Sequence, residues 1–282
     1  MDNRFIVACS NGSIELVKDL LNDEQVDINQ AYPSDDLSPL CIACRKGHIE
    51  IVKLLLNDKR IEINKPSSKH HQTPIYIACQ AGYIKIVKLL LNNKRIDVNK
   101  ASYNDETPFY VACQNGHIEI VKLLLQDGRV DVNQASKGEL TPFVIACEKR
   151  WMEIIKLLLN DGRIDINKAD KYRATPLHNS CYYGDIEIVE NILSSRKEVN
   201  LTAKDGDEKT PLDIAREGAN EEIRGLWEDE EDFQQRKKSC IKIIELLESF
   251  ERNPDETRTK LRMKLGFAGK ASFHFLFIKL QF

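Results

Sequence analysis

The stretch TPFYVACQNGHIEIVKLLLQDGRVDVN, residues 107–133, decides the fold of this 282-residue chain. It is one copy of a unit that recurs along most of the sequence. Subtracting residue numbers at one small-residue position of the unit gives steps of 35, 35, 34, 34 and 34 residues. That position is a cysteine in six copies, namely Cys9, Cys44, Cys79, Cys113, Cys147 and Cys181. A fixed step of this size predicts a solenoid of stacked repeats.

The residue types of this copy predict two helices and a short extended segment. Thr107 can cap the first helix with its hydroxyl, and Pro108 suits the first helical position because its missing N–H costs nothing there. Gly116 follows eight residues later and suits the left-handed turn that ends a helix. The second helix, from Ile118 onward, has an apolar face too wide for one neighbour, so it must pack between neighbours. Alternating apolar and polar residues over 128–133 predict an extended finger.

Several motifs recur together in this unit: Thr-Pro, a pair of small residues, Gly-His, Ile-Val and Leu-Leu-Leu. This set resembles the ankyrin repeat, and the resemblance extends over about residues 1–250. It implies an all-α solenoid of stacked helix–turn–helix units joined by short extended, β-hairpin-like fingers. The first copy begins directly in its first helix, as a terminal capping unit would. Six further copies begin at Ser38-Pro39, Thr73-Pro74, Thr107-Pro108, Thr141-Pro142, Thr175-Pro176 and Thr210-Pro211.

The seventh copy is interrupted, and the chain changes character after it. The apolar pattern of its second helix begins at Ile241, 31 residues after Thr210, whereas this interval is 11 residues in the other copies. An insertion is therefore predicted at residues 219–238. The predicted domains are a solenoid over residues 1–252 and a C-terminal capping helix with an apolar tail over residues 253–282.

The insertion and the last stretch of the chain each leave alternatives open. The insertion contains the acidic run WEDEEDF, with Trp227 and Phe233 at its ends. This run is either a solvated helical or irregular excursion pinned by its aromatic residues or an acidic recognition element. The final stretch SFHFLFIKLQF, residues 272–282, could fold back on the solenoid, pair as a strand or dock on a partner.

Composition and charge restrict the partners and the compartment. The formal net charge is −3 and the pI about 6.1, which gives no general attraction to nucleic acid or to an anionic membrane. The first residues lack the apolar run of a signal peptide, and no run approaches the ~18 apolar residues of a membrane span. The sequence therefore predicts a monomeric protein of the cytoplasm or nucleus, with no transmembrane segment, whose partner is another protein rather than nucleic acid.

Neither the cysteines nor the histidines predict a metal, a cofactor or a catalytic centre. Equivalent cysteines sit on helices about 8–10 Å apart, beyond the ~7 Å that a disulfide spans, so they should be reduced and buried. Cys41 and Cys44 form a C-x-x-C inside a first helix, where neither zinc binding nor redox chemistry is expected. By the resemblance, His48, His117 and His178 occupy structural hydrogen-bonding positions. No phosphate loop, nucleophile elbow or H-E-x-x-H motif occurs, so we expect no enzymatic activity.

Departures from the repeat pattern mark the candidate binding residues. Arg150 and Trp151 replace Gly-His in the fifth copy, so we expect a strained turn there, with Trp151 either a core aromatic or an exposed anchor. Tyr182 and Tyr183 occupy the two variable positions before Gly184, where exposed aromatic residues would be binding hot spots. With the finger tips included, the predicted partner-binding residues are Tyr103, Trp151, Tyr172, Arg173, Tyr182 and Tyr183. The competing interpretation is a solvated face with incidental tyrosines.

The resemblance implies a function in protein recognition. The leading hypothesis is a non-enzymatic scaffold or adaptor that binds a partner on the concave face of the repeat stack. The alternative is a substrate-recruiting or regulatory subunit of an enzyme complex, such as a ubiquitin ligase, that acts through the C-terminal region. A third hypothesis places a catalytic site within residues 219–282.

Overall fold

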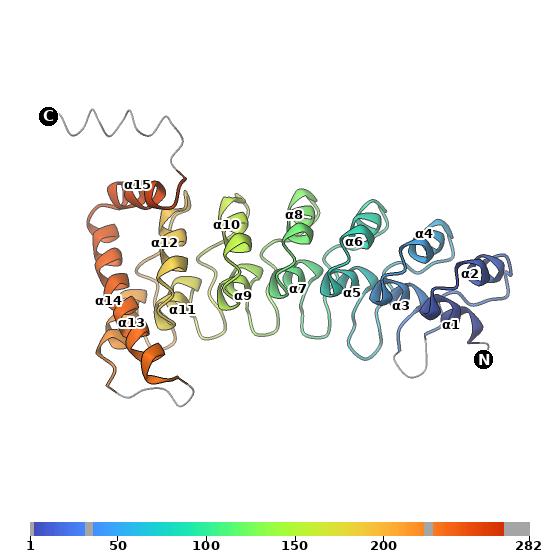
Figure 1. Ribbon diagram of the computed structural model, residues 1–282, viewed down its shortest axis with the longest axis horizontal. Helices are drawn as coiled ribbons and strands as arrows, with labels where there is room; N and C mark the ends of the chain where they lie inside the picture. Colours follow the sequence, from blue (N-terminus) through green and yellow to red (C-terminus); the bar gives the residue numbers. More distant parts are fainter. Residues whose placement is uncertain (1–2, 32–35, 223–227, 268–282) are drawn as a thin grey trace. The chain divides into compact units, whose positions relative to one another are not determined.

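The computed structural model describes residues 3–31, 36–222 and 228–267. The chain divides into two compact units, residues 1–146 and 147–282, and each is a stack of helix pairs (Figure 1). All regular structure in the described ranges is helical. The predicted all-α repeat architecture is therefore confirmed.

The first unit contains four helix pairs in two layers. The first helices of the pairs contact one another along one layer, and the second helices do so along the other (Figure 1). The first helices are α1 (Arg4–Asn11), α3 (Pro39–Lys46), α5 (Pro74–Ala81) and α7 (Pro108–Gln114). The second helices are α2 (Ile14–Leu21), α4 (Ile49–Asn57), α6 (Ile84–Leu91) and α8 (Ile118–Gln126). Helix α9 (Pro142–Glu148) begins in this unit and ends in the second.

The ends of the first helices are set by the residues that the sequence singles out. The Thr107 hydroxyl accepts a hydrogen bond from the Tyr110 N–H at 3.0 Å, and Pro108 occupies the first turn. The C-terminal ends of first helices are set by glycine, as at Gly82 after α5. Gly82 has a φ of +77°, and a Cβ there would lie 2.8 Å from the His117 ring of the next copy. Only glycine satisfies both the left-handed backbone and this close approach.

Close packing of the first helices depends on their small residues. The Ala-Cys pair of α3, α5 and α7 is completely buried in each helix, which lets adjacent helices approach without a cavity. All eight cysteines are free and buried, as predicted for the six periodic ones. The cysteines therefore serve as small apolar core residues.

The fingers between copies are hairpin-shaped turns rather than strands. In the finger after α6, the Ser102 N–H donates to the Glu106 carbonyl at 2.9 Å, and Asp105 has a φ of +58°. The next finger is joined to this one by a hydrogen bond from the Lys137 N–H to the Asn104 carbonyl at 2.8 Å. The predicted hairpin-like shape is present, although no described finger residue is assigned to a strand.

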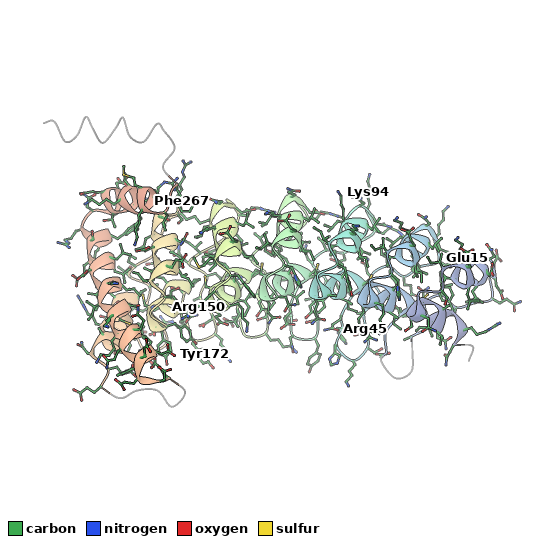
Figure 2. The ribbon with its side chains drawn as sticks, viewed as in Figure 1. Glu15, Arg45, Lys94, Arg150, Tyr172 and Phe267 are labelled. Atoms are coloured by element: carbon green, nitrogen blue, oxygen red, sulfur yellow. The ribbon has the colours of Figure 1, made fainter. Side chains whose placement is uncertain are left out.

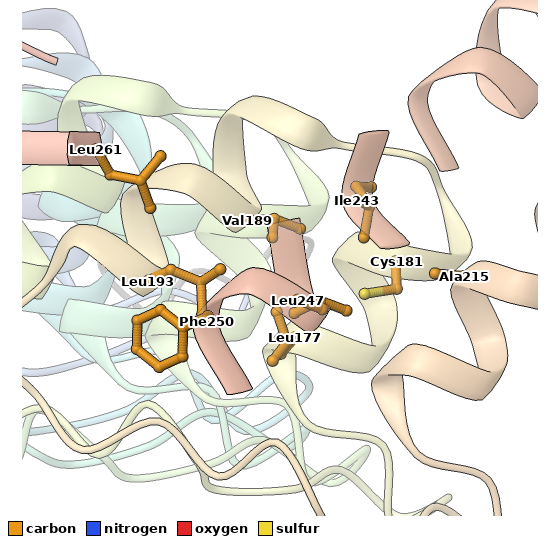
Figure 3. Close-up of a cluster of buried hydrophobic side chains, with 9 residues drawn as sticks. All are labelled: Leu177, Cys181, Val189, Leu193, Ala215, Ile243, Leu247, Phe250 and Leu261. Carbon is orange, nitrogen blue, oxygen red and sulfur yellow. The ribbon is translucent and has the colours of Figure 1, made fainter. Parts of the chain in front are cut away.

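The second unit combines regular repeats with a longer C-terminal element. After the end of α9 it contains α10 (Met152–Asn160), α11 (Pro176–Tyr182), α12 (Ile186–Ser194), α13 (Pro211–Asn220), α14 (Glu230–Arg252) and α15 (Pro254–Lys264). Its core unites the last helices of the unit, as Figure 3 shows. The buried members are Leu177, Cys181, Val189, Leu193, Ala215, Ile243, Leu247, Phe250 and Leu261.

The second helix of the seventh copy begins before its apolar pattern does. The apolar pattern placed its start at Ile241, but α14 begins at Glu230, so the second half of the predicted insertion continues into that helix. The Asp229 side chain caps α14 by accepting from the Asp232 N–H at 2.8 Å, and the acidic first turn favours a helix N-terminus. Phe233 is buried, as expected of a residue that pins this segment, whereas Trp227 lies outside the described residues.

Helix α15 covers the end of the second unit, at the position where a capping helix was predicted. Leu261 is buried against the core, and the Arg262 guanidinium donates to the Ser194 carbonyl at 3.1 Å. The Lys264 ammonium pairs with Glu190. The apolar stretch 272–282 lies outside the described residues.

His178 links the sixth copy to the next finger and gives the second unit a dependence on pH. The Thr175 N–H donates to Nδ1 of His178 at 3.1 Å, so Nε2 carries the proton and donates to the Lys209 carbonyl at 3.0 Å. Protonation of Nδ1 would break the first bond inside a buried site. Burial accordingly lowers the pKa of His178 below its ordinary value of 6.5.

This depressed pKa predicts an acid-sensitive second unit. Above about pH 6.5, His178 is neutral in both the folded and the unfolded chain. As the pH drops below this value, the unfolded chain binds the proton first, so the free energy of unfolding decreases. The loss is at most about 1.4 kcal/mol per pH unit, until the folded state also titrates. Urea unfolding at pH 7 and pH 5 should show this loss in the native protein. His178→Asn should show a smaller loss, and an identical pH dependence in both would contradict the assignment.

Candidate protein-binding surface

The predicted partner-binding aromatic residues are all exposed on the structure. The exposed fractions are 61% for Tyr103, 42% for Trp151, 66% for Tyr172, 63% for Tyr182 and 51% for Tyr183. Trp151 is therefore not a core residue, which removes one of its two interpretations. Of these residues, Tyr182 and Tyr183 border one cleft in the second unit.

Tyr182 and Tyr183 form a tight aromatic pair at the end of α11. Their ring centroids are 5.1 Å apart, and the ring planes are nearly perpendicular at 84°. Such an edge-to-face arrangement is favourable, and it fixes two large rings at the surface before any ligand binds. Burial and then the nearby Glu148 carboxylate raise the pKa of Tyr183. Both rings are exposed at the surface.

The cleft beside this pair has a volume of about 690 Å³. One side consists of the tyrosine pair and the adjoining turns, and the other is helix α14. The charged and polar residues around the cleft are Arg150, Asp185, Glu221, Glu228, Asp232, Gln235, Arg236 and Ser239. All of these lie in the second unit.

Arg150 occupies the strained turn that the sequence predicted, and it has a specific partner. Its φ is +54°, in the left-handed region where a non-glycine residue costs roughly 1 kcal/mol or more. Its guanidinium pairs with the Asp185 carboxylate at 2.5 Å, and Figure 2 marks its position on the turn after α9. Burial raises the pKa of Asp185, and Arg150 partly offsets this.

The Arg150–Asp185 pair replaces a contact that other copies make with glycine and an aromatic ring. In the first unit, Gly12 faces the His48 ring and Gly82 faces the His117 ring of the following copy. Arg150 stands at the glycine position and Asp185 at the ring position of the next copy. Arg150 and Asp185 therefore depart from the repeat together: an ion pair between them takes the place of the contact between glycine and an aromatic ring.

We expect the two changes to be energetically coupled. Arg150→Gly alone should bring little or no gain, because relief of the turn leaves Asp185 half-buried without its partner. Arg150→Gly with Asp185→His should stabilise the second unit by about 1 kcal/mol, since it restores the glycine and ring contact. Urea midpoints of the single and double variants provide the check. A double variant no more stable than Arg150→Gly would refute the coupling.

Tyr172 and Arg173 lie on a finger tip of the second unit and are held by the next finger. The Tyr172 carbonyl accepts from the Gly206 N–H at 2.8 Å, and the Arg173 guanidinium pairs with Glu208 at 3.0 Å. The Lys171 ammonium lies 4.7 Å from the centroid of the Tyr172 ring. This finger presents a fixed aromatic ring, but its arginine is already paired.

Tyr103 belongs to the first unit and has separate surroundings. The Lys137 ammonium lies 3.6 Å from the centroid of its ring, and the His71 ring meets it edge-on at 6.1 Å. Its exposed ring therefore already carries a cation on one face.

The described residues contain neither a group of metal ligands nor a membrane-spanning helix. Among the described residues, no group of three or more histidine, cysteine or acidic side chains is arranged to hold a metal ion. No described helix is both long and apolar enough to cross a bilayer. The cleft of the second unit is lined by exposed aromatic side chains and by charged side chains.

Comparison with known proteins agrees with this geometry. A family model described as ankyrin repeats (3 copies) matches residues 5–102, 62–136 and 109–205, which together cover more than half of the chain. The chain belongs to the ankyrin repeat family. Ankyrin repeats typically mediate protein–protein interactions and are generally not catalytic. No curated protein matches this ankyrin chain in sequence.

Two solved ankyrin structures illustrate the shared fold. The crystal structure of the ankyrin repeat domain of Bcl-3, a member of the IkappaB protein family, superposes with a TM-score of 0.70 at 21% identity. The match covers 86% of this chain and 98% of the Bcl-3 domain. The human ASB11 ankyrin repeat domain gives a TM-score of 0.60 at 23% identity, covering 82% of this chain and 96% of that domain. At these identities the likeness shows the fold alone.

Sequence reasoning missed the residues that α14 contributes to the cleft. The acidic run drew attention to this segment, but Gln235, Arg236 and Ser239 carried no signal of their own. The helical spacing of positions 228, 232, 235, 236 and 239 would have placed them on one face. Only the early start of α14 brings that face into contact with the cleft.

Proposed function

We propose that this ankyrin repeat protein is a non-enzymatic scaffold that binds another protein through the surface around Tyr182 and Tyr183. The observation that supports the proposal most directly is the exposed, fixed aromatic pair on the border of a cleft. Tyrosine provides large contact area at low conformational cost, and hot spots of protein interfaces are enriched in it. Trp151 and Tyr172 add exposed aromatic area within the same unit.

The state of the cysteines supports a reducing compartment. All eight are unpaired thiols although the chain carries enough of them for four bridges. Secreted proteins of this cysteine content commonly form disulfides, whereas cytosolic and nuclear proteins keep their thiols reduced. We therefore propose a cytoplasmic or nuclear location.

A double substitution tests the proposed binding surface. Tyr182→Ala with Tyr183→Ala should reduce recovery of an interacting protein from the source cell at least about tenfold, since a true anchor contributes roughly 2 kcal/mol or more. The thermal midpoint should change by less than about 2 °C, because both rings are exposed. Leu16→Ala is the matched control, since it removes an exposed apolar side chain from α2 of the first unit.

Two results would contradict the proposal. The double variant could unfold, which would show that the rings support the fold. Alternatively, every interactor could be retained and lost only from a chain that ends at Phe267. That second result would favour a regulatory subunit that acts through its C-terminal residues. The chain must not be cut at Arg252, because α15 buries Leu261 in the core.

A further inference from the structure

The N-terminal half of α14 forms a wall that no other described repeat possesses. Helix α14 has 23 residues, whereas the second helices of the other copies have eight or nine. Residues 232, 235, 236 and 239 of its N-terminal half, with Glu228 just before it, line the same cleft as the tyrosine pair. This cleft is therefore a feature of the seventh copy and not a general property of the repeat.

The wall is held firmly against the turn that follows α11. Gly184 has a φ of +68°, and a Cβ there would lie 3.0 Å from Cγ and 3.2 Å from the carbonyl oxygen of Arg236. The Arg236 guanidinium binds Glu228 at 2.9 Å and Glu221 at 2.8 Å. These two carboxylates raise the pKa of Arg236, which stays charged. The cleft thus exists before a ligand arrives, which lowers the entropic cost of binding.

The charges around the cleft are unbalanced. Four carboxylates, those of Asp185, Glu221, Glu228 and Asp232, face only two guanidiniums, those of Arg150 and Arg236. Arg150 is paired with Asp185, and Arg236 with the two glutamates. The Asp232 carboxylate forms no ion pair within the described residues. The described lining therefore carries a surplus of two negative charges, one from Asp232 and one from the two glutamates that share Arg236.

We propose that this cleft binds a lysine- and arginine-rich segment of a partner protein. The faces of Tyr182 and Tyr183 can accept a cationic side chain, and Asp232, which lines the same cleft from α14, can pair with the same or a neighbouring cation. An acidic segment or a nucleic acid would instead meet repulsion. This inference rests on the proposed function and adds the chemical class of the partner.

Peptide binding to the full chain tests the proposal. The probe is a fluorescein-labelled peptide of about twelve residues in which arginine and lysine alternate with glycine and serine, so that several basic side chains can reach the cleft. Its control replaces every arginine and lysine with glutamine. Fluorescence anisotropy should show the basic peptide binding at least about tenfold more tightly than the control, and its affinity should fall with added salt.

A pair of charge reversals on the same helix locates the site. Asp232→Lys should weaken the basic peptide at least about tenfold, while Glu245→Lys should weaken it less than about threefold. Both changes alter the net charge equally, but Glu245 is exposed on α14 and does not line the cleft. Tyr182→Ala with Tyr183→Ala should also weaken binding about tenfold. Circular dichroism and the thermal midpoint confirm that each variant folds. If Asp232→Lys does not fold, Asp232→Asn replaces it in the binding measurement.

The outcomes separate this inference from the proposed function. Equal affinity for the basic and glutamine peptides, or equal losses from Asp232→Lys and Glu245→Lys, would overturn the inference. If the double tyrosine variant nevertheless loses its cellular partner, the proposed function stands with a partner of different chemistry. If the basic peptide binds as expected but the tyrosine variant keeps every partner, the cleft does bind basic segments. The proposal that Tyr182 and Tyr183 bind the cellular partner is then wrong.

Discussion

Phe250→Ala is expected to destabilise the second unit by about 3–5 kcal/mol, the usual cost of removing a buried phenylalanine. The Phe250 ring is 4% exposed and joins α14 to the core that α12 and α15 share (Figure 3). Its loss would leave a cavity where the last helices meet. Because both tryptophans, Trp151 and Trp227, belong to residues 147–282, tryptophan fluorescence during urea unfolding reports on this unit.

A conservative variant provides the control for this prediction. Phe250→Leu keeps most of the apolar volume and should cost less than about 1.5 kcal/mol. The Arg258 guanidinium lies 5.3 Å from the Phe250 ring centroid, so part of the loss in either variant comes from this contact. Equal urea midpoints for Phe250→Ala and the native chain would show that α14 does not stabilise the repeats before it.

The second large effect concerns the cysteines. Burial raises the pKa of Cys41 to about 11 and that of Cys9 to about 12, and it raises the pKa of Cys79, Cys113 and Cys147 further. A rise from 9.0 to about 11 alone lowers the reactive thiolate fraction about a hundredfold. Alkylation of the native protein should therefore be slower than that of the denatured protein by at least about this factor.

Mass spectrometry of alkylated peptides provides the measurement. Every cysteine should remain largely unmodified until denaturant is added, and then all should react. Rapid native labelling of Cys79, Cys113 and Cys147 would contradict the packing described for the first helices. Labelling confined to Cys240 would instead indicate local opening of α14.

The parts of the fold that the sequence could predict are those specified locally. A threonine that caps, a proline in the first turn and a glycine in the left-handed region determine first helices such as α5 and α7 without reference to distant residues. The strained turn at Arg150 was predictable for the same reason, since it replaces one of these glycines. Exposure of the variable tyrosines also followed from their register in the repeat.

What could not be predicted depends on contacts between separate elements. Residues before Ile241 lack an apolar periodicity, so the early start of α14 depends on the Asp229 cap and on Phe233 reaching the core. The cleft exists because Arg236 packs on Gly184, a contact between residues 52 positions apart. The partner of Arg150 did carry a signal, because Asp185 departs from the repeat at the complementary position one copy later.

Site-specific photo-crosslinking shows whether a protein partner occupies the surface around the tyrosine pair. The photoreactive amino acid p-benzoylphenylalanine would replace Tyr183 in one chain and the exposed Leu16 of α2 in another. Irradiation in the source cell should yield a discrete adduct with a partner protein from position 183 and none from position 16. Adducts of equal yield from both positions, or adducts from position 16 alone, would show that the tyrosine pair does not mark the binding surface.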